Sequence, residues 1–114
     1  MSHADVVELE LNIKEAKDIV ALGDALERLE KNRDFKKVIK EAYLHEEAIR
    51  LVHLKADANM QNERIQQNVL RDIDSIGAFA QFLQEVFRRA DMARDAVIAC
   101  EETLDDIRGE GDDE

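Results

Sequence analysis

His45, Glu46 and His53 are the residues with the most suggestive chemistry, because imidazole and carboxylate groups on one helix can hold a metal ion. The two histidines lie eight residues apart, whereas the zinc-protease signature His-Glu-x-x-His places two imidazoles one turn apart. The chain also lacks any Glu-x-x-His pair, the pattern of di-iron carboxylate bundles. The sequence therefore predicts surface or interface histidines and no metal site.

Other catalytic arrangements are also missing from the sequence. It contains no Gly-rich phosphate loop and no Gly-x-Ser-x-Gly elbow. Cys100 is the single cysteine, so one chain can form neither an internal disulfide nor a cysteine-based zinc site. Adjacent acids such as Glu46 and Glu47 point about 100° apart on a helix and do not converge. We expect no catalytic residue, no cofactor and no enzymatic activity.

Charge narrows the classes of partner. The formal net charge is −11, which disfavours direct nucleic-acid binding through phosphate neutralisation. Residues 101–114 carry eight acids and Arg108, a net −7, and the first hundred residues carry only −4. We interpret residues 109–114 as a disordered acidic tail. The densest basic stretch surrounds Lys36 and Lys37 and could meet an acidic surface, including the tail of a neighbouring copy.

Composition indicates the elements that must position these side chains. The 114 residues are 45% hydrophobic and 38% charged, with four glycines and no proline, a balance typical of helical bundles and coiled coils. We predict an all-α fold without β-sheet, in which a helical hairpin or small bundle has a long, coiled-coil-like C-terminal helix. Helices are expected at about 5–31, 35–55 and 63–108, in a single domain covering residues 1–108.

The first two predicted helices carry local signals of bending and capping. The apolar pattern of the first slips near Gly23, where a bend is expected. Asp34 is a candidate N-cap for the second. That second segment is either one curved helix or two short helices that meet near Tyr43 and Leu44. Residues 56–62 have the Asp and Asn content of a loop and should reverse the chain.

The second helix should pack against the first half of the long helix and form the main core. An apolar face on each supplies the side chains. The predicted core residues are Phe35, Ile39, Tyr43, Ile73, Ile76, Phe79 and Leu83, with Val38, Ile49, Val52 and Phe82 as further contacts.

The second half of the long helix should carry an interface. Apolar residues recur three and four apart from Ile65 to Ile107, so an unbroken helix would be roughly 65 Å long. Gly77 leaves three options open: a kink, a close approach of another helix, or no interruption. Part of the apolar seam should extend beyond the protein's own fold and need a partner. The predicted interface residues are Ala93, Val97, Cys100, Leu104 and Ile107.

One part of the chain resembles a known group of proteins. Residues 34–61, DFKKVIKEAYLHEEAIRLVHLKADANMQ, and the Ile-Asp-Ser-Ile-Gly stretch at 73–77 look like short acidic helical proteins of tailed bacteriophages. That group is associated with genes for head and connector assembly. The resemblance extends from Arg33 to about Phe87, about half of the chain, and includes no known catalytic position. It implies a virion component or an assembly factor.

We therefore expect a non-enzymatic structural or assembly protein of a tailed phage that forms homo-oligomers or binds other phage structural proteins. A scaffold and a capsid-, portal- or tail-associated protein are all compatible with the pattern. The alternative is an acidic phage-encoded inhibitor that binds a basic host surface as a nucleic-acid mimic; a metal-binding bundle is a third hypothesis. No membrane association is expected, because there is no run of eighteen apolar residues and no signal peptide. The expected location is the cytoplasm of the bacterial host during assembly, or the virion.

Overall fold

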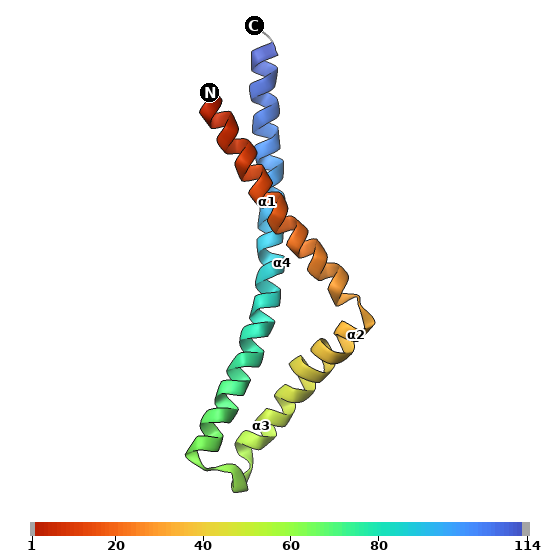
Figure 1. Cartoon of the computed structure of the whole chain (residues 1–114), viewed down its shortest axis with the longest axis vertical. Helices are drawn as coiled ribbons and strands as arrows, with labels where there is room; N and C mark the ends of the chain where they lie inside the picture. Colours follow the sequence, from red (N-terminus) through yellow and green to blue (C-terminus); the bar gives the residue numbers. More distant parts are fainter. Residues whose placement is uncertain (1, 113–114) are drawn as a thin grey trace. The chain divides into compact units, whose positions relative to one another are not determined.

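The computed structural model describes residues 2–112, and helices account for nearly all of them (Figure 1). The prediction of an all-α fold with a long C-terminal helix is confirmed, and residues 2–112 contain no strand. The elements are α1 (His3–Glu30), α2 (Arg33–Phe35), the π-helix η1 (Lys36–Glu47), α3 (Ala48–Ala56), the short 3₁₀ turn η2 (Ala58–Met60) and α4 (Glu63–Asp112).

The described end of α4 differs from the predicted end at residue 108. The helix continues through residues 109–112, which the sequence assigned to a disordered acidic tail. These residues include no proline, and adding residues to an existing helix is far easier than nucleating one. The remaining tail residues, 113 and 114, lie outside the described part of the chain.

Gly77 leaves α4 uninterrupted. The helix runs from Glu63 to Asp112, and no described glycine has a positive φ. A Cβ built on Gly77 would meet nothing within 4 Å, so no neighbouring helix approaches there. Of the three options that the sequence left open, the structure shows the uninterrupted helix.

The segment between α1 and α3 is one continuous run of helical turns with a wide central part. Phe35, Ile39 and Tyr43 are half-buried and recur every four residues. Steps of four advance 400° on an α-helix, so such a series drifts off one face by about 40° per step. The i→i+5 hydrogen bonding of η1 gives a wider turn, so successive members of the series are not related by the α-helical angle. The curved-helix alternative is therefore the closer of the two predictions.

Asn32 caps this segment. Its side-chain oxygen accepts hydrogen bonds from the backbone N–H groups of Asp34 and Phe35, both at 3.0 Å. The N-cap is thus two residues before Asp34, the candidate suggested by the sequence. Asparagine and aspartate side chains can both cap a helix. Asn32 is the cap here because α1 ends at Glu30 and the next helix begins at Arg33, directly after Asn32.

Contacts divide the chain into two compact units. Unit 1 comprises residues 1–26 and 85–114, and unit 2 comprises residues 27–84. The sequence predicted one domain over residues 1–108. α4 is long enough for its two halves to take different partners: the last part pairs with α1, and the first part pairs with η1 and α3.

Unit 2 contains an apolar core around three buried side chains. Leu51, Val69 and Ile76 are 1%, 2% and 7% exposed. Tyr43 and Phe79 meet edge to face, with ring centroids 6.0 Å apart and planes at 77°. The side chains packed around this core are Tyr43, Leu44, Ala48, Leu54, Ile65 and Ile73.

The predicted core residues occupy this region with different degrees of burial. Ile76 and Leu83 are buried, and Phe35, Ile39, Tyr43, Ile73 and Phe79 are half-buried. Leu51 and Val69, which lie at the centre, were not among the predicted core residues. The expectation of further contacts was wrong, because four side chains are between 45% and 59% exposed: Val38, Ile49, Val52 and Phe82.

Side-chain amides stabilise the chain reversal between α3 and α4. Gln61 donates from Nε2 to the carbonyl oxygens of Lys55 and Asp57, at 3.0 and 2.7 Å. Gln66 donates to the carbonyl oxygens of Lys55 and Met60, at 3.1 and 2.7 Å. These bonds satisfy carbonyl groups left open at the end of α3 and through the turn. The predicted loop at 56–62 therefore forms a hydrogen-bonded hairpin turn.

No helix among residues 2–112 combines the length and the apolar character needed to cross a bilayer.

Candidate helix-pairing surfaces

The predicted interface residues lie on the side of α4 that α1 covers within unit 1. Ala93 and Leu104 are 7% and 4% exposed, and Val97, Cys100 and Ile107 are half-buried. The expectation that this seam extends beyond the protein's own fold is therefore corrected. α1 supplies an apolar face, including buried Ile13, that packs there.

Two small residues form a close contact in this helix pair. Gly23 of α1 is buried, and Ala90 of α4 is 0% exposed. A Cβ placed on Gly23 would overlap the Cβ of Ala90. Gly23 is thus required for a close helix approach, and the predicted bend is not its role: α1 continues unbroken from His3 to Glu30.

Arg94 ties the two helices together beside this contact. Its guanidinium donates to Asp24 of α1 and to Asp91 of α4, both at 2.7 Å. The same guanidinium would lie 3.9 Å from a Cβ on Gly23. The ion pairs of Arg94 are therefore next to the contact between Gly23 and Ala90. A fork-shaped donor that joins two carboxylates favours one relative position of the helices.

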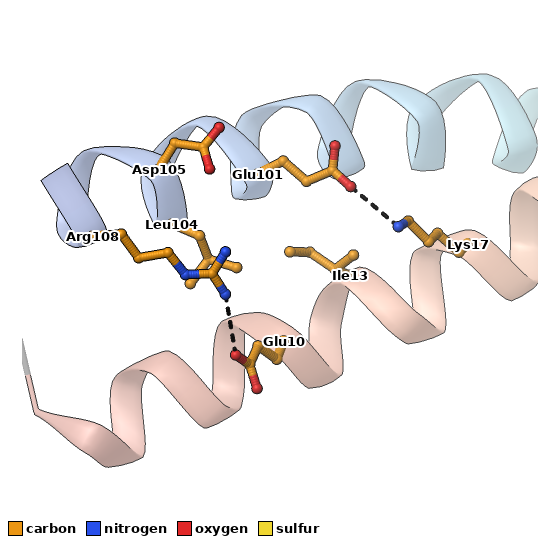
Figure 2. Close-up of a pocket in the computed structure, with 7 residues that line it drawn as sticks. All are labelled: Glu10, Ile13, Lys17, Glu101, Leu104, Asp105 and Arg108. Atoms are coloured by element: carbon orange, nitrogen blue, oxygen red, sulfur yellow. Dashed lines mark ion pairs between the residues drawn. The ribbon is translucent and has the colours of Figure 1, made fainter.

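A shallow groove follows the pair towards the ends of the two helices (Figure 2). Its volume is about 340 Å³. Ile13 and Leu104 form the apolar floor, and two ion pairs bridge the rims: Lys17 with Glu101 at 3.2 Å, and Arg108 with Glu10 at 3.5 Å. Exposed pairs of this kind contribute about 0–1 kcal/mol each, so they select the helix register more than they stabilise it.

The described residues contain no group of three or more His, Cys, Asp or Glu side chains that could hold a metal. His45 and His53 are exposed on unit 2, and Cys100 of unit 1 is half-buried as a free thiol. Within residues 2–112, none of these three side chains forms an ion pair or a side-chain hydrogen bond.

Unit 2 presents a basic cleft near the start of η1. Its volume is about 340 Å³, and its lining is Lys31, Arg33, Lys36, Lys37 and Glu41. Lys40, which follows in the same basic stretch, pairs with Glu30 at 2.8 Å. The basic stretch around Lys36 and Lys37 is thus an exposed cleft with one acid at its edge.

Ion pairs between residues three and four positions apart lie in α4 at the start of the segment that belongs to unit 1. A hydrogen bond from Arg88 to Glu85, supported by Arg89, lowers the pKa of Glu85 from 4.5 to about 2. In η1 and α3 the Arg50 guanidinium likewise lowers the pKa of Glu47. Both pairs lie within one turn of helix and are exposed to solvent.

Many large apolar side chains face outward. The exposed set is Val7, Leu11, Ile19, Leu22, Leu29, Val38, Ile49, Val52, Leu70, Phe82, Met92 and Ile98. The sequence analysis recognised a slip in the apolar pattern of α1 but did not single out Val7 and Leu11, which lie on the same side of the helix as Leu22. The signal was present, because Val7, Leu11 and Leu22 are separated by four and eleven residues, close to one and three helical turns.

Comparison with protein-family models, with curated proteins and with solved structures finds no match to this chain.

Proposed function

We propose that this chain is a non-enzymatic structural or assembly protein of a tailed bacteriophage, acting through helix–helix contacts in multiple copies. Its partners are further copies of itself and other phage structural proteins. The proposal covers a scaffold and a capsid-, portal- or tail-associated component alike.

The observation that carries the proposal is the balance between exposed and buried apolar side chains. Among the described residues, twelve large apolar side chains are exposed, whereas ten apolar residues are buried and two of those are alanines. Single exposed apolar residues are ordinary on a soluble protein. An excess over the buried set leaves α1, α4 and the η1–α3 segment with apolar surface that a partner can cover.

The phage assignment is supported by the resemblance at residues 34–61 and 73–77. These stretches form the η1–α3 helix and the facing part of α4, which build the core of unit 2. The resemblance thus includes the apolar core of unit 2. Symmetric particles repeat one contact many times, so a short helical chain with outward apolar surface suits that use.

The test combines mass in solution with particle composition. Sedimentation equilibrium of the pure protein should give a mass above 13.1 kDa for one chain. Phage in which the gene is deleted should lose particle yield, and supplying the gene in trans should restore it. Quantitative mass spectrometry of purified particles then separates a virion component from an assembly factor that leaves.

A different outcome would overturn the proposal. Normal yields of complete, infectious particles without the gene would exclude an assembly role. If the chain then captured a basic host protein in a stoichiometric complex that dissolves at high salt, it would instead be the acidic inhibitor.

A further inference from the structure

The outward face of α1 within unit 1 is apolar at both ends and charged in the middle. Val7, Leu11 and Leu22 are 48%, 52% and 56% exposed. Lys14 and Asp18, both exposed, lie between Leu11 and Leu22. At 100° per residue, all five positions fall within about 80° of the helix circumference and extend over about 22 Å.

This face is distinct from the one that packs against α4. Ile13 is buried and lines the groove with Leu104, and its position is about 200° from that of Leu11 around the helix. α1 is therefore apolar on two opposite sides. One side has α4 as its partner in unit 1, and within the described chain the other remains open to solvent at Val7, Leu11 and Leu22.

The two central charges have no partner within the described chain. Lys14 and Asp18 are four residues apart and could pair along the helix, yet no ion pair joins them to each other or to another described residue. Some exposed charges of α1 do pair, such as Lys17 with Glu101 and Glu10 with Arg108, whereas Glu8 and Glu15 form no ion pair with a described residue. The outward face thus carries one unused positive and one unused negative charge at its centre.

We propose that this face of α1 pairs with the same face of a second copy in antiparallel orientation. The inference rests on the proposed function, because it names the first partner and the surface of that assembly. An antiparallel pairing centred near residue 16 places Leu11 opposite Leu22 of the other copy, and Lys14 opposite Asp18. Twofold symmetry repeats each contact, so one surface gives two apolar contacts and two ion pairs.

Charge complementarity selects this orientation. In a parallel pair, Lys14 would face Lys14 and Asp18 would face Asp18, and both contacts would be repulsive. Antiparallel pairing converts both contacts into attraction. It also brings Val7 opposite exposed Ala25, a large residue against a small one. Glu15 lies at the margin of the face, near Asp18 of the other copy, and weakens the pair.

The first test is charge reversal measured by sedimentation equilibrium of the full chain. Lys14→Glu and Asp18→Lys should each weaken dimerisation at least tenfold, because each leaves two like-charge contacts. The double variant should dimerise about as tightly as the original chain. Glu15→Gln should tighten the dimer. Lys37→Glu makes the same charge change in the basic cleft and serves as the matched control, with no expected effect.

Mixing the two single variants separates contacts between copies from contacts within one helix. Within each variant chain, positions 14 and 18 have like charges, so a pair along the helix stays broken. In an antiparallel mixed dimer, the introduced glutamate of one chain faces the introduced lysine of the other, and the remaining Asp18 faces the remaining Lys14. A mixed dimer should therefore form although neither variant dimerises alone. Circular dichroism of every variant should show unchanged helix content, which excludes unfolding as the cause.

A crosslink tests orientation. In a Cys100→Ser background, Leu11→Cys and Leu22→Cys proteins should form a disulfide-linked heterodimer when mixed and oxidised, in preference to either homodimer. Preferential homodimers would indicate parallel pairing and overturn the inference.

Several outcomes would overturn the proposed pairing of the α1 face while leaving the proposed function intact. The inference fails if both single variants assemble like the original chain, or if the unmodified chain is monomeric up to about millimolar concentration. Loss of assembly in Lys37→Glu alone would assign the contact to the basic cleft and an acidic segment of another copy. Particle assembly that proceeds without the gene would reject the proposed function even if the dimer forms.

Discussion

In unit 1 a close contact between helices joins Gly23 to Ala90, whereas in unit 2 the central contact joins Leu51, Val69 and Ile76. The first brings two backbones close together and buries little apolar surface. The second buries whole aliphatic side chains, each worth about 1.5–3 kcal/mol relative to exposure. Unit 1 also buries large aliphatic side chains, so what distinguishes it from unit 2 is the added close approach of two small residues.

Polar groups also have different roles in the two units. In unit 1, Arg94 and the rim pairs connect α1 to α4 through half-exposed side chains. In unit 2, Gln61 and Gln66 satisfy carbonyl groups of the chain reversal. Surface ion pairs contribute little and weaken with salt, while hydrogen bonds in a turn fix the connection itself. We therefore expect the α1–α4 contact of unit 1 to weaken more with added salt than the chain reversal of unit 2.

The largest expected effect comes from removing the centre of unit 2. Leu51→Ala deletes a side chain that is 1% exposed, and such truncations cost about 2–5 kcal/mol. Hydrogen exchange should rise across η1, α3 and the first half of α4. Val52→Ala, at a neighbouring position that is 59% exposed, is the control and should change stability by less than about 0.5 kcal/mol. Equal effects of the two changes would mean that Leu51 is not at the centre of a core.

The next effect tests the small-residue contact of unit 1. Gly23→Ala adds a methyl group that overlaps the Cβ of Ala90, and neither atom can rotate away because each is fixed to a helix backbone. Overpacking costs about 1–3 kcal/mol, more than the helix propensity that alanine gains. Hydrogen exchange should rise over residues 3–26 and 85–112, with unit 2 little affected.

Gly77→Ala is the matched control for this substitution. Its Cβ would meet nothing within 4 Å, and it lies in the interior of α4. The same change should therefore stabilise the helix by up to about 1 kcal/mol. Opposite signs at the two glycines would establish the close contact, whereas stabilisation at both would show that α1 does not approach α4 at Gly23.

The sequence allowed the helices to be predicted because their signals are local. Apolar spacing located α1 and α4, the absence of proline agreed with an unbroken α4, and Asp and Asn residues located the reversal at 56–62. The position of Gly23 against Ala90 could not be obtained in this way. It depends on which two faces meet, and these residues lie far apart in the sequence.

The same limit explains the incomplete prediction of the core and the seam. Leu51, Ile49 and Val52 are all apolar, and the spacing within α3 alone does not show that Leu51 is the one that faces α4. Ile49 and Val52 point outward while Leu51 is buried. The predicted seam at Ala93 and Leu104 is apolar for the reason given by the sequence, yet its partner in unit 1 is α1 of the same chain.

A smaller effect should come from the cap that begins the second helical segment. Asn32→Ala removes the acceptor for the N–H groups of Asp34 and Phe35, at a cost of about 1 kcal/mol. The loss should appear as faster exchange in α2 and the start of η1. Asn12→Ala, in the exposed interior of α1, should instead be neutral or slightly stabilising because alanine is the better helix former. A neutral Asn32→Ala would show that the segment begins without this cap.

The smallest effect concerns pH and the Glu85 pair. Because its folded pKa is lowered from 4.5 to about 2, chiefly by the hydrogen bond from Arg88, this carboxylate adds stability above pH 4.5 that is lost as the pH falls towards 2. The loss should be small because the pair is exposed, and Glu85→Gln should remove it from the pH profile of helix content. Glu47 has one arginine partner, Arg50, and its pKa is also lowered. Carbon-detected NMR titration should therefore give Glu85 a midpoint near 2, and a midpoint near 4.5 would mean that the Arg88 contact does not persist in solution.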